Sequence, residues 1–239
     1  MTQQATQVWT RPSGRALTEL RPLSVSLSPQ KFAAGSVIIK WGDTHVLCSA
    51  SLEEGVPSFT DQLGWVSAEY SLLPGSTHTR ARRERKSVGG RTAEIQRLIA
   101  RSLRGALDLN QLQEHTLTLD CDVIQADGGT RCAAITGSYI AASIALHRLG
   151  YRPPHFAAVS FGLMEGHVIT DLCYEEDSQV DVDCNVVWCE SGLIEVQGTA
   201  ERGTFSPSQL SEMLTRAEAL SEQLFSFQRE ALRQAGLEG

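Results

Sequence analysis

The hydrophobic period of this chain changes abruptly, and the change restricts the folds that the chain can adopt. From Thr92 to Asn110, apolar residues recur every three or four positions, the spacing of an amphipathic helix that Thr92 is placed to cap. Residues 116–123 then alternate apolar and polar side chains, which is typical of a strand with one buried face. Residues 133–149 return to helical character and are rich in small side chains. The chain is therefore predicted to pack helices against a sheet.

Strand patterns surround these two helices. They cover residues 21–28, 35–41, 44–50 and 64–70 before the first helix, and residues 156–163, 167–174, 185–189 and 193–197 after the second. Gly-containing turns join several of these strands into hairpins. A last helix is expected from Pro207 to about Ala235, and residues 74–90 are expected to form a loop. Because hairpin connections dominate, we predict an α+β sandwich with mixed or antiparallel sheets.

Composition excludes several other classes of protein. With 41% hydrophobic and 21% charged residues, the chain resembles a globular protein rather than a disordered one. No stretch approaches 18 consecutive apolar residues, and the first residues lack the apolar segment of a signal peptide. Six cysteines occur without a CxxC pair, as expected for reduced thiols. We expect one cytoplasmic domain over residues 1–239, without membrane contact, whose first ten or so and last few residues are flexible.

A dense basic segment stands out in a chain whose net charge is −7. Residues 80–104 contain nine basic and only two acidic residues. Local positive charge in an acidic protein is typical of a surface that binds a polyanion while the rest of the molecule repels it. The same pattern also fits a solvated helix face, so the segment alone leaves both interpretations open.

Two glycine pairs precede helices at positions suited to anion binding. Residues 127–131 (DGGTR) join a predicted strand to a helix, where backbone N–H groups and the positive helix end can approach an anion. Residues 89–92 (GGRT) begin the earlier helix in the same manner. If both helix ends face one cleft, Arg91 and Arg131 could hold one phosphate between them. A tight turn with a helix cap is the alternative interpretation of either segment.

Residues 175–183 (EEDSQVDVD) form an acidic segment directly after a predicted strand. Carboxylate oxygens suit Mg²⁺, which takes one or two protein carboxylates and completes its shell with water and phosphate. In one extended strand, Asp177 and Asp183 would lie roughly 20 Å apart. A shared ion therefore requires the segment to bend back. An exposed acidic loop without a ligand is the alternative.

A series of specific motifs follows one another in order over about residues 10–230. They include GR at 14–15, AEY at 68–70, STHTR at 76–80, GGRT at 89–92, EIQRLIAR at 94–101, LDCDV at 119–123, QADGGTR at 125–131, EDS at 176–178 and EVQGT at 195–199. Together they resemble the bacterial ribonuclease PH family. The resemblance implies a ribosomal-protein-S5-domain-2-like α+β fold that assembles as a homohexamer, a trimer of dimers.

The resemblance also implies an enzyme, a phosphate-dependent tRNA nucleotidyltransferase. Such an enzyme trims precursor tRNA from 3′ to 5′, releases nucleoside 5′-diphosphates, and can add nucleotides in the reverse direction. Inorganic phosphate is its co-substrate, and the family's phosphate contacts match Arg91, Gly129, Thr130 and Arg131. The family's catalytic acids match Asp177 and Asp183, which would also bind Mg²⁺ or Mn²⁺.

The basic loop would bind the RNA backbone. Its cations give affinity for precursor tRNA, or for any RNA with a free 3′ end, without a choice of sequence. The residues expected to make these contacts are Arg80, Arg82, Arg83, Arg85 and Lys86. Two alternatives remain at this stage: a catalytically inert, RNA-binding ring subunit, and a metal-dependent nuclease that uses water in place of phosphate.

Overall fold

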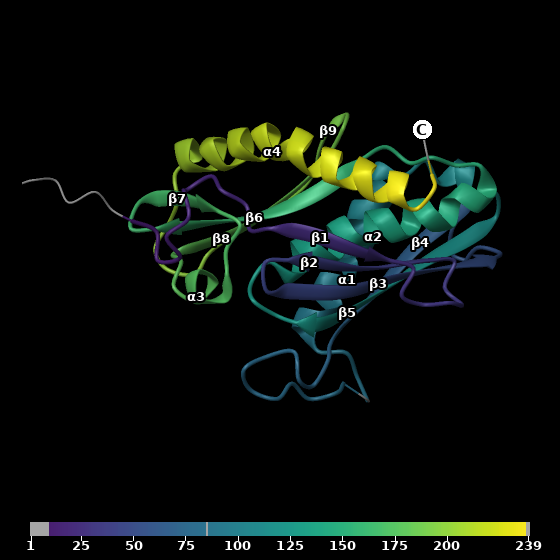
Figure 1. Cartoon of the computed structure of the whole chain (residues 1–239), viewed down its shortest axis with the longest axis horizontal. Coiled ribbons are helices and arrows are strands. Elements are labelled where there is room, and N and C mark those ends of the chain that lie inside the picture. The colour runs from purple at the N-terminus through teal and green to yellow at the C-terminus, as the bar shows by residue number, and fades with distance from the viewer. Residues whose placement is uncertain (1–9, 85, 238–239) are drawn as a thin grey trace, which may run out of the picture.

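The computed structural model describes residues 10–84 and 86–237, which form two β-sheets with helices packed between and over them (Figure 1). Sheet A has five strands in the order β1 (Leu23–Leu27), β2 (Gly35–Trp41), β3 (Thr44–Glu54), β5 (His115–Gln125) and β4 (Gly64–Leu72). Its neighbours run antiparallel, except for the parallel pair β4 and β5. The chain ends that were predicted to be flexible lie outside the described residues.

Sheet B has four strands, all antiparallel. Their order is β7 (His167–Thr170), β6 (Phe156–Met164), β8 (Val182–Cys189) and β9 (Gly192–Ala200). Every residue of β6 is buried, because this central strand is covered on both faces. The predicted α+β arrangement of mixed and antiparallel sheets is confirmed.

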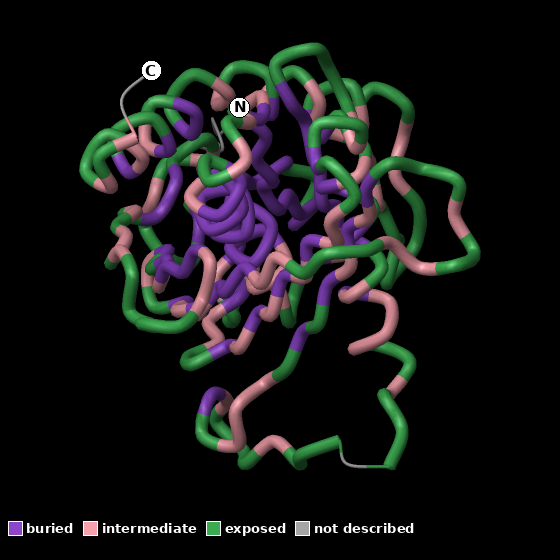
Figure 2. The backbone as a smooth tube through the Cα atoms, turned by 90° about the vertical axis from the view of Figure 1, so that its right-hand side faces the viewer, coloured by how far each residue is buried: buried purple, intermediate pink, exposed green. Residues whose placement is uncertain are grey.

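Helix α2 (Thr130–Leu146) lies at the centre of the molecule and contacts both sheets, as the buried helix in Figure 2 shows. Helix α1 (Gly90–Ala106) packs against β4 and touches α2 and β9, and a short 3-10 helix, η1 (Leu109–Leu112), follows it. Helix α4 (Pro207–Gln234) covers sheet B and extends over α2. The remaining helices are short: η2 (His147–Leu149) continues α2, and α3 (Tyr174–Asp177) lies between β7 and β8.

Small side chains allow α2 to be buried from several sides. A Cβ atom on Gly137 would approach the Cys48 sulfur to 2.7 Å and Ile39 to 2.8 Å, so only glycine lets sheet A pack this closely. On the facing sheet, β5 buries Leu117, Leu119, Cys121 and Val123 and leaves the alternate residues more exposed. This is the face that the alternating sequence pattern predicts.

Several sequence-based expectations about element ends are wrong. The helix that was expected to continue to about Asn110 ends at Ala106. Gly89, not Thr92, is the N-cap of α1, and the Thr92 hydroxyl donates instead to Glu84 Oε1 at 3.1 Å. The strand expected over residues 167–174 ends at Thr170. Asp171 has a positive φ of 56°, which breaks the extended backbone, and its N–H donates to the Ser160 carbonyl at 2.7 Å. The chain then turns into α3.

All six cysteines are free thiols, and five of them are buried. Among the described residues, none of the helices combines the length and the apolar character that crossing a bilayer requires.

Candidate active site

A cavity of about 360 Å³ opens where α1 and α2 begin, between sheet A and sheet B. Seven of the residues singled out in the sequence line it together: Arg80, Arg91, Gly129, Thr130, Arg131, Asp177 and Asp183. They come from a loop, two helix N-termini, α3 and β8, which are far apart in the sequence. The structure thus brings the two glycine-rich turns and the acidic segment to one place.

The turn before α2 presents the positive end of that helix to the cavity. Gly129 is the N-cap, with φ of 62°, a left-handed conformation that glycine adopts without strain. The first-turn N–H groups of α2 have no carbonyl partner within the helix, so they are suited to an anion. Thr130 is oriented by Tyr70, whose hydroxyl donates to Thr130 Oγ1 at 2.9 Å.

Close packing at Gly128 joins this turn to α3. Its φ is 70°, and a Cβ atom there would lie 2.6 Å from the Cys173 carbonyl carbon and 2.9 Å from the Tyr174 nitrogen. The Tyr174 N–H also donates to Asp127 Oδ1 at 3.1 Å. The turn before α2 and the helix that carries Asp177 are therefore in direct contact.

A buried network of ion pairs and hydrogen bonds stabilises this contact. Arg21 Nη2 lies 2.8 Å from Asp171 Oδ1, and Arg21 Nη1 donates to the Asp127 carbonyl. Arg11 binds Glu176 in α3 through two hydrogen bonds of 2.7 Å. Burial raises the pKa of Glu176, but hydrogen bonds from Arg11 and from the Cys173 backbone outweigh it and lower the pKa to about 2. The chain immediately before Asp177 is thereby held in place.

Arg131 crosses the cavity between two carboxylates. Its Nη1 lies 3.6 Å from Asp183 Oδ2, and its Nη2 lies 3.7 Å from Glu94 Oε2 on α1. The third nitrogen, Nε, is buried and has no hydrogen-bond partner among the described residues. A buried donor left without an acceptor is costly, so this atom points to an anionic ligand.

Asp177 and Asp183 are brought together by the bend that the metal hypothesis required. Helix α3 and the turn after it reverse the chain between them, and both line the cavity. Burial, reinforced by the charge of Asp177 and opposed by Arg131 and Arg91, raises the pKa of Asp183 to about 6. Burial also raises the pKa of Asp177, against the same two arginines.

Among the described residues, no three His, Cys, Asp or Glu side chains gather as a metal site. Two carboxylates that repel each other across a polar cavity nevertheless fit Mg²⁺ or Mn²⁺, which accept few protein ligands and take the rest from water and phosphate. The Asn185 amide N–H donates to Asp183 Oδ1 at 3.3 Å and orients one of the two groups.

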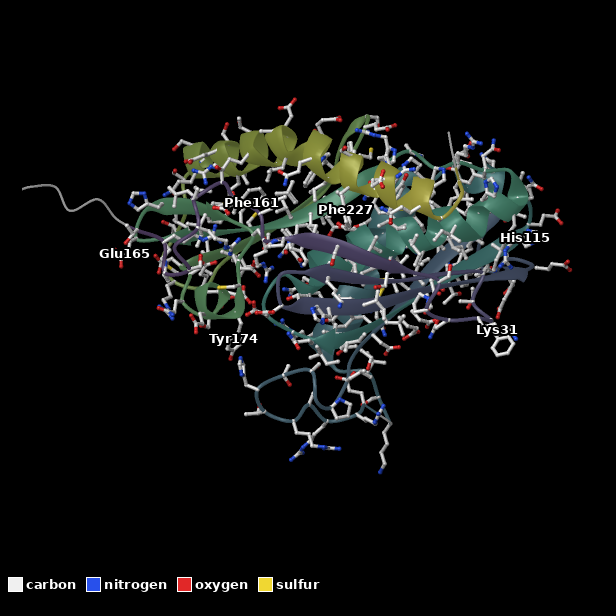
Figure 3. The ribbon with its side chains drawn as sticks, viewed as in Figure 1. Lys31, His115, Phe161, Glu165, Tyr174 and Phe227 are labelled. Atoms are coloured by element: carbon white, nitrogen blue, oxygen red, sulfur yellow. The ribbon has the colours of Figure 1, made fainter. Side chains whose placement is uncertain are left out.

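The basic loop extends below β5 in Figure 1 and is largely exposed in Figure 2. Only Arg80 among its predicted RNA contacts lines the cavity; Arg82, Arg83 and Lys86 are exposed beyond it. Arg85 lies outside the described residues. The loop touches α3 through His78, whose ring centroid is 5.1 Å from that of Tyr174, the residue that faces the loop in Figure 3.

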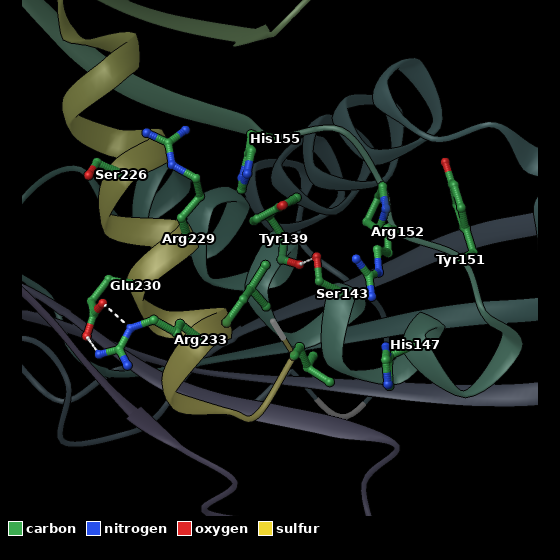
Figure 4. A pocket seen from close by; sticks show the side chains of 13 residues that line it. Tyr139, Ser143, His147, Tyr151, Arg152, His155, Ser226, Arg229, Glu230 and Arg233 are labelled. Atoms are coloured by element: carbon green, nitrogen blue, oxygen red, sulfur yellow. Dashed lines mark hydrogen bonds and ion pairs between the residues drawn. The ribbon is translucent and has the colours of Figure 1, made fainter. Parts of the chain in front are cut away.

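A larger cavity of about 580 Å³ lies at the other end of α2, against the last turns of α4 (Figure 4). Its lining includes Tyr139, His155 and Arg152. Its single acidic side chain, Glu230, accepts two hydrogen bonds from Arg233 at 2.7 and 2.8 Å. This cavity therefore lacks the free carboxylate pair that distinguishes the smaller one.

Several residues of the site escaped the sequence analysis. Tyr70 and Asn185 lie within the motifs of the resemblance, but nothing in their local sequence indicates a contact with the cavity. Glu94 sits in the helical motif 94–101 and resembles any acidic residue of an exposed helix face. Ser160, on the fully buried strand β6, carries no local signal.

The arrangement is suited to chemistry between two anions. Two helix N-termini and two arginines converge on the cavity, and a carboxylate pair lines it beside them. The cationic groups can hold an anionic nucleophile, and the carboxylates can hold a cation that neutralises a second anion. Transfer of a phosphoryl or nucleotidyl group has this requirement.

Comparison with protein-family models identifies both halves of the chain. Residues 19–151 match the model described as "3′ exoribonuclease family, domain 1", and residues 156–219 match "3′ exoribonuclease family, domain 2". The chain is 51% identical over 238 residues to a protein named ribonuclease PH from Synechococcus sp. (strain JA-3-3Ab), covering 94% of this chain and 98% of that one. A ribonuclease PH from Crocosphaera subtropica is 50% identical over 238 residues, covering 95% and 99%.

Solved structures share the fold. Rice Rrp46 superposes with a TM-score of 0.79 at 22% identity over 93% of this chain and all of its own. The Archaeoglobus fulgidus exosome with RNA bound to the active site gives a TM-score of 0.78 at 20% identity, over 91% of this chain and 92% of that one. The sequence comparisons confirm the resemblance to ribonuclease PH and the predicted enzyme class, a phosphorolytic exoribonuclease. The chain belongs to the 3′ exoribonuclease family.

Proposed function

We propose that the cavity at the N-terminal ends of α1 and α2 is where this exoribonuclease binds inorganic phosphate and cleaves RNA. Phosphate would be held by Arg91, Gly129, Thr130 and Arg131. The observation that carries this assignment is the buried Nε of Arg131, which has no acceptor among the described residues and lies beside a helix N-terminus. A phosphate oxygen at this position would accept a hydrogen bond from Arg131 Nε and interact with the helix N-terminus.

The reaction joins two negatively charged groups. A phosphate oxygen forms a bond to the phosphorus of the terminal phosphodiester, the bond to the 3′ oxygen of the preceding nucleotide breaks, and that oxygen takes up a proton. The products are a nucleoside 5′-diphosphate and an RNA one nucleotide shorter, and the reverse step adds a nucleotide. The proposed arginines and helix ends offset the repulsion before any bond changes, so positioning and electrostatics supply the catalysis.

Asp177 and Asp183 would be the catalytic acids that bind Mg²⁺ or Mn²⁺. Their raised pKa values support this role, because a bound cation relieves the unfavourable charge that burial and proximity create. When bound, such an ion neutralises charge on the scissile phosphate and stabilises the leaving oxygen. The Asn185 amide and Arg131 would keep Asp183 in position.

The basic loop would bind the RNA strand leading to the cavity. Arg80 lines the cavity, and Arg82, Arg83 and Lys86 extend the positive surface outward, with Arg85 expected to contribute as well. Contacts of this kind act on the backbone, so precursor tRNA and other RNAs with a free 3′ end would be accepted alike. Precursor tRNA is the substrate that we propose for the cell, and trimming of its 3′ end is the proposed reaction.

We also propose a homohexamer, a trimer of dimers, formed in the cytoplasm from single-domain subunits. One hydrophobic core includes side chains from both sheets, which supports a single domain. The outer strand β9 carries Leu193 and Val196 at 55% and 40% exposure, so it offers apolar surface to a neighbour. Free, mostly buried thiols fit a reducing compartment. Light scattering of the purified protein would test the assembly.

The decisive experiment supplies an RNA with a free 3′ end to the purified protein. Nucleoside 5′-diphosphates are expected, and only when inorganic phosphate and a divalent cation are both present. Nucleoside monophosphates formed in phosphate-free buffer would replace this proposal with hydrolysis. An absence of products under all conditions would favour the alternative, an inert RNA-binding ring subunit.

A further inference from the structure

The guanidinium of Arg131 is held between two carboxylates without a hydrogen bond to either. Its separations of 3.6 Å from Asp183 and 3.7 Å from Glu94 exceed the range of N–H···O hydrogen bonds. Its side chain is only 16% exposed, so solvent does not account for the distance. Attraction to one carboxylate is therefore balanced by attraction to the other.

The same molecule shows how an arginine binds a carboxylate when no second acid opposes it. Arg11 makes two parallel hydrogen bonds of 2.7 Å to Glu176, the geometry that planar guanidinium and carboxylate groups prefer. If Arg131 bound Asp183 in this way, its donors would occupy the carboxylate oxygens that a cation needs. It would also turn its own N–H groups away from phosphate.

Glu94 is fixed on the far side of Arg131. The Gln197 amide on β9 donates to Glu94 Oε1 at 2.5 Å, and this bond leaves Oε2 facing Arg131. Helix α1 and strand β9 are in contact, so the hydrogen bond from Gln197 restrains Glu94 beside Arg131. The negative charge of the Glu94 carboxylate therefore stays beside Arg131.

We propose that Glu94 is a positioning residue that draws Arg131 off Asp183 and so keeps the carboxylate free for a divalent cation. The inference rests on the proposed phosphorolysis site and adds to it a residue outside the phosphate and metal contacts. Without the negative charge of Glu94, Asp183 is the nearest carboxylate to Arg131, and a bidentate ion pair would form and compete with the cation.

The test replaces Glu94 by glutamine, which keeps the size of the side chain and its bond from Gln197 but removes the charge. Mn²⁺ binding to the RNA-free protein is measured by electron paramagnetic resonance of the free ion. Glu94→Gln is expected to weaken Mn²⁺ binding about tenfold. The Mg²⁺ concentration for half-maximal phosphorolysis should rise to a similar extent, while turnover at saturating Mg²⁺ returns close to that of the unaltered enzyme.

The control is Glu195→Gln. Glu195 accepts hydrogen bonds from Arg101 across the same seam between α1 and β9, but its partner is not Arg131. The Glu195→Gln variant should leave Mn²⁺ binding unchanged. A second variant, Gln197→Leu, frees Glu94 without removing its charge and should weaken Mn²⁺ binding by a smaller factor, so the inference stays testable if Glu94→Gln fails to fold.

Equal Mn²⁺ affinity in Glu94→Gln and Glu195→Gln would overturn the inference. Failure of the proposed function gives a different result: Asp183→Asn would then bind Mn²⁺ as tightly as the unaltered protein, or the unaltered protein would degrade RNA without phosphate. The two failures are therefore distinguishable in one set of measurements.

Discussion

Arg21 and Asp171 form a buried ion pair across 150 positions of the sequence, with Arg21 Nη2 2.8 Å from Asp171 Oδ1. The same carboxylate accepts hydrogen bonds from the Arg21 backbone at 2.6 Å and from the Trp41 indole at 3.0 Å. Arg21 in turn donates to the carbonyl of Asp127. The pair thus connects the N-terminal segment, sheet B and the turn that begins α2, so the shape of the candidate site depends on it.

Replacing Arg21 by methionine should be strongly destabilising. The change leaves Asp171 buried and short of its main partner, and the loss of one member of a buried pair costs roughly 3–5 kcal/mol. Urea unfolding measures the free energy of unfolding. As a control, Arg233→Met removes an exposed pair with Glu230 and should change the free energy of unfolding much less. A similar loss in the free energy of unfolding in both variants would mean that the buried pair stabilises the fold no more than the exposed pair does.

Gly128→Ala tests the contact between α3 and the turn before α2, where we propose that phosphate binds. The new Cβ would collide with the backbone of Leu172 and Cys173, and the φ of 70° is strained for alanine. The turn must then move away from Asp177, and a shift of about 1 Å in a catalytic group can lower kcat/KM about 100-fold. Gly75→Ala is the control, because a Cβ there meets no described atom within 4 Å. Phosphorolysis assays at limiting phosphate should separate the two; comparable activity would contradict the role of this contact.

Local chemistry in the sequence predicts much of this site. The glycine pairs, Arg91 and Arg131 could be identified because anion binding at a helix N-terminus needs those residue types at those positions. The change of hydrophobic period likewise predicts α1, β5 and α2. Asp177 and Asp183 could be named, but their approach depended on a bend that the sequence alone left open.

The parts that could not be predicted depend on contacts between distant segments. The end of β7 is set by the backbone of Asp171, which turns to meet Arg21 and Ser160. Glu94 acquires a role only because β9 supplies Gln197 beside it. Thr92 does not cap α1, which begins at Gly90, because Glu84 in the preceding loop binds the Thr92 hydroxyl and the Gly89 N–H. Such pairings follow from the tertiary fold and leave no local pattern.

Arg131→Ala should remove the use of phosphate while RNA binding stays nearly intact. The substitution deletes the buried Nε donor and the cation nearest the proposed phosphate position, and the loss of such a group lowers turnover roughly 100- to 1,000-fold. Steady-state assays over a range of phosphate concentrations measure the loss, and filter binding measures RNA affinity. Arg97→Ala, on the exposed face of α1, serves as the control. Unaltered turnover at limiting phosphate would exclude Arg131 from the phosphate site.

Asp183→Asn should stabilise the protein at pH 7.5 in a chelating buffer. Burial and the charge of Asp177 raise the pKa of Asp183 to about 6, above its value in the unfolded chain, so the ionised carboxylate disfavours the folded state. The gain, on the order of 2 kcal/mol, should be present above pH 6 and shrink as the pH falls from 6 toward the unfolded-state pKa of about 3.9. It should vanish only near pH 3, where the aspartate is protonated in both states. Thermal unfolding between pH 3 and 8 measures it. A gain that does not depend on pH would have another cause.

Neutralising the basic loop should weaken RNA binding in a salt-dependent way. Arg82 and Arg83 are exposed, and each phosphate contact to single-stranded RNA contributes about −0.7 to the slope of log K against log salt. The double variant Arg82→Gln and Arg83→Gln should therefore reduce the magnitude of the slope by about 1.4 and raise the KM for RNA, with little effect on the KM for phosphate. Arg148→Gln with Arg152→Gln removes two exposed charges at the other end of α2 and should leave the slope unchanged. An identical slope in both double variants would place the path of the RNA away from this loop.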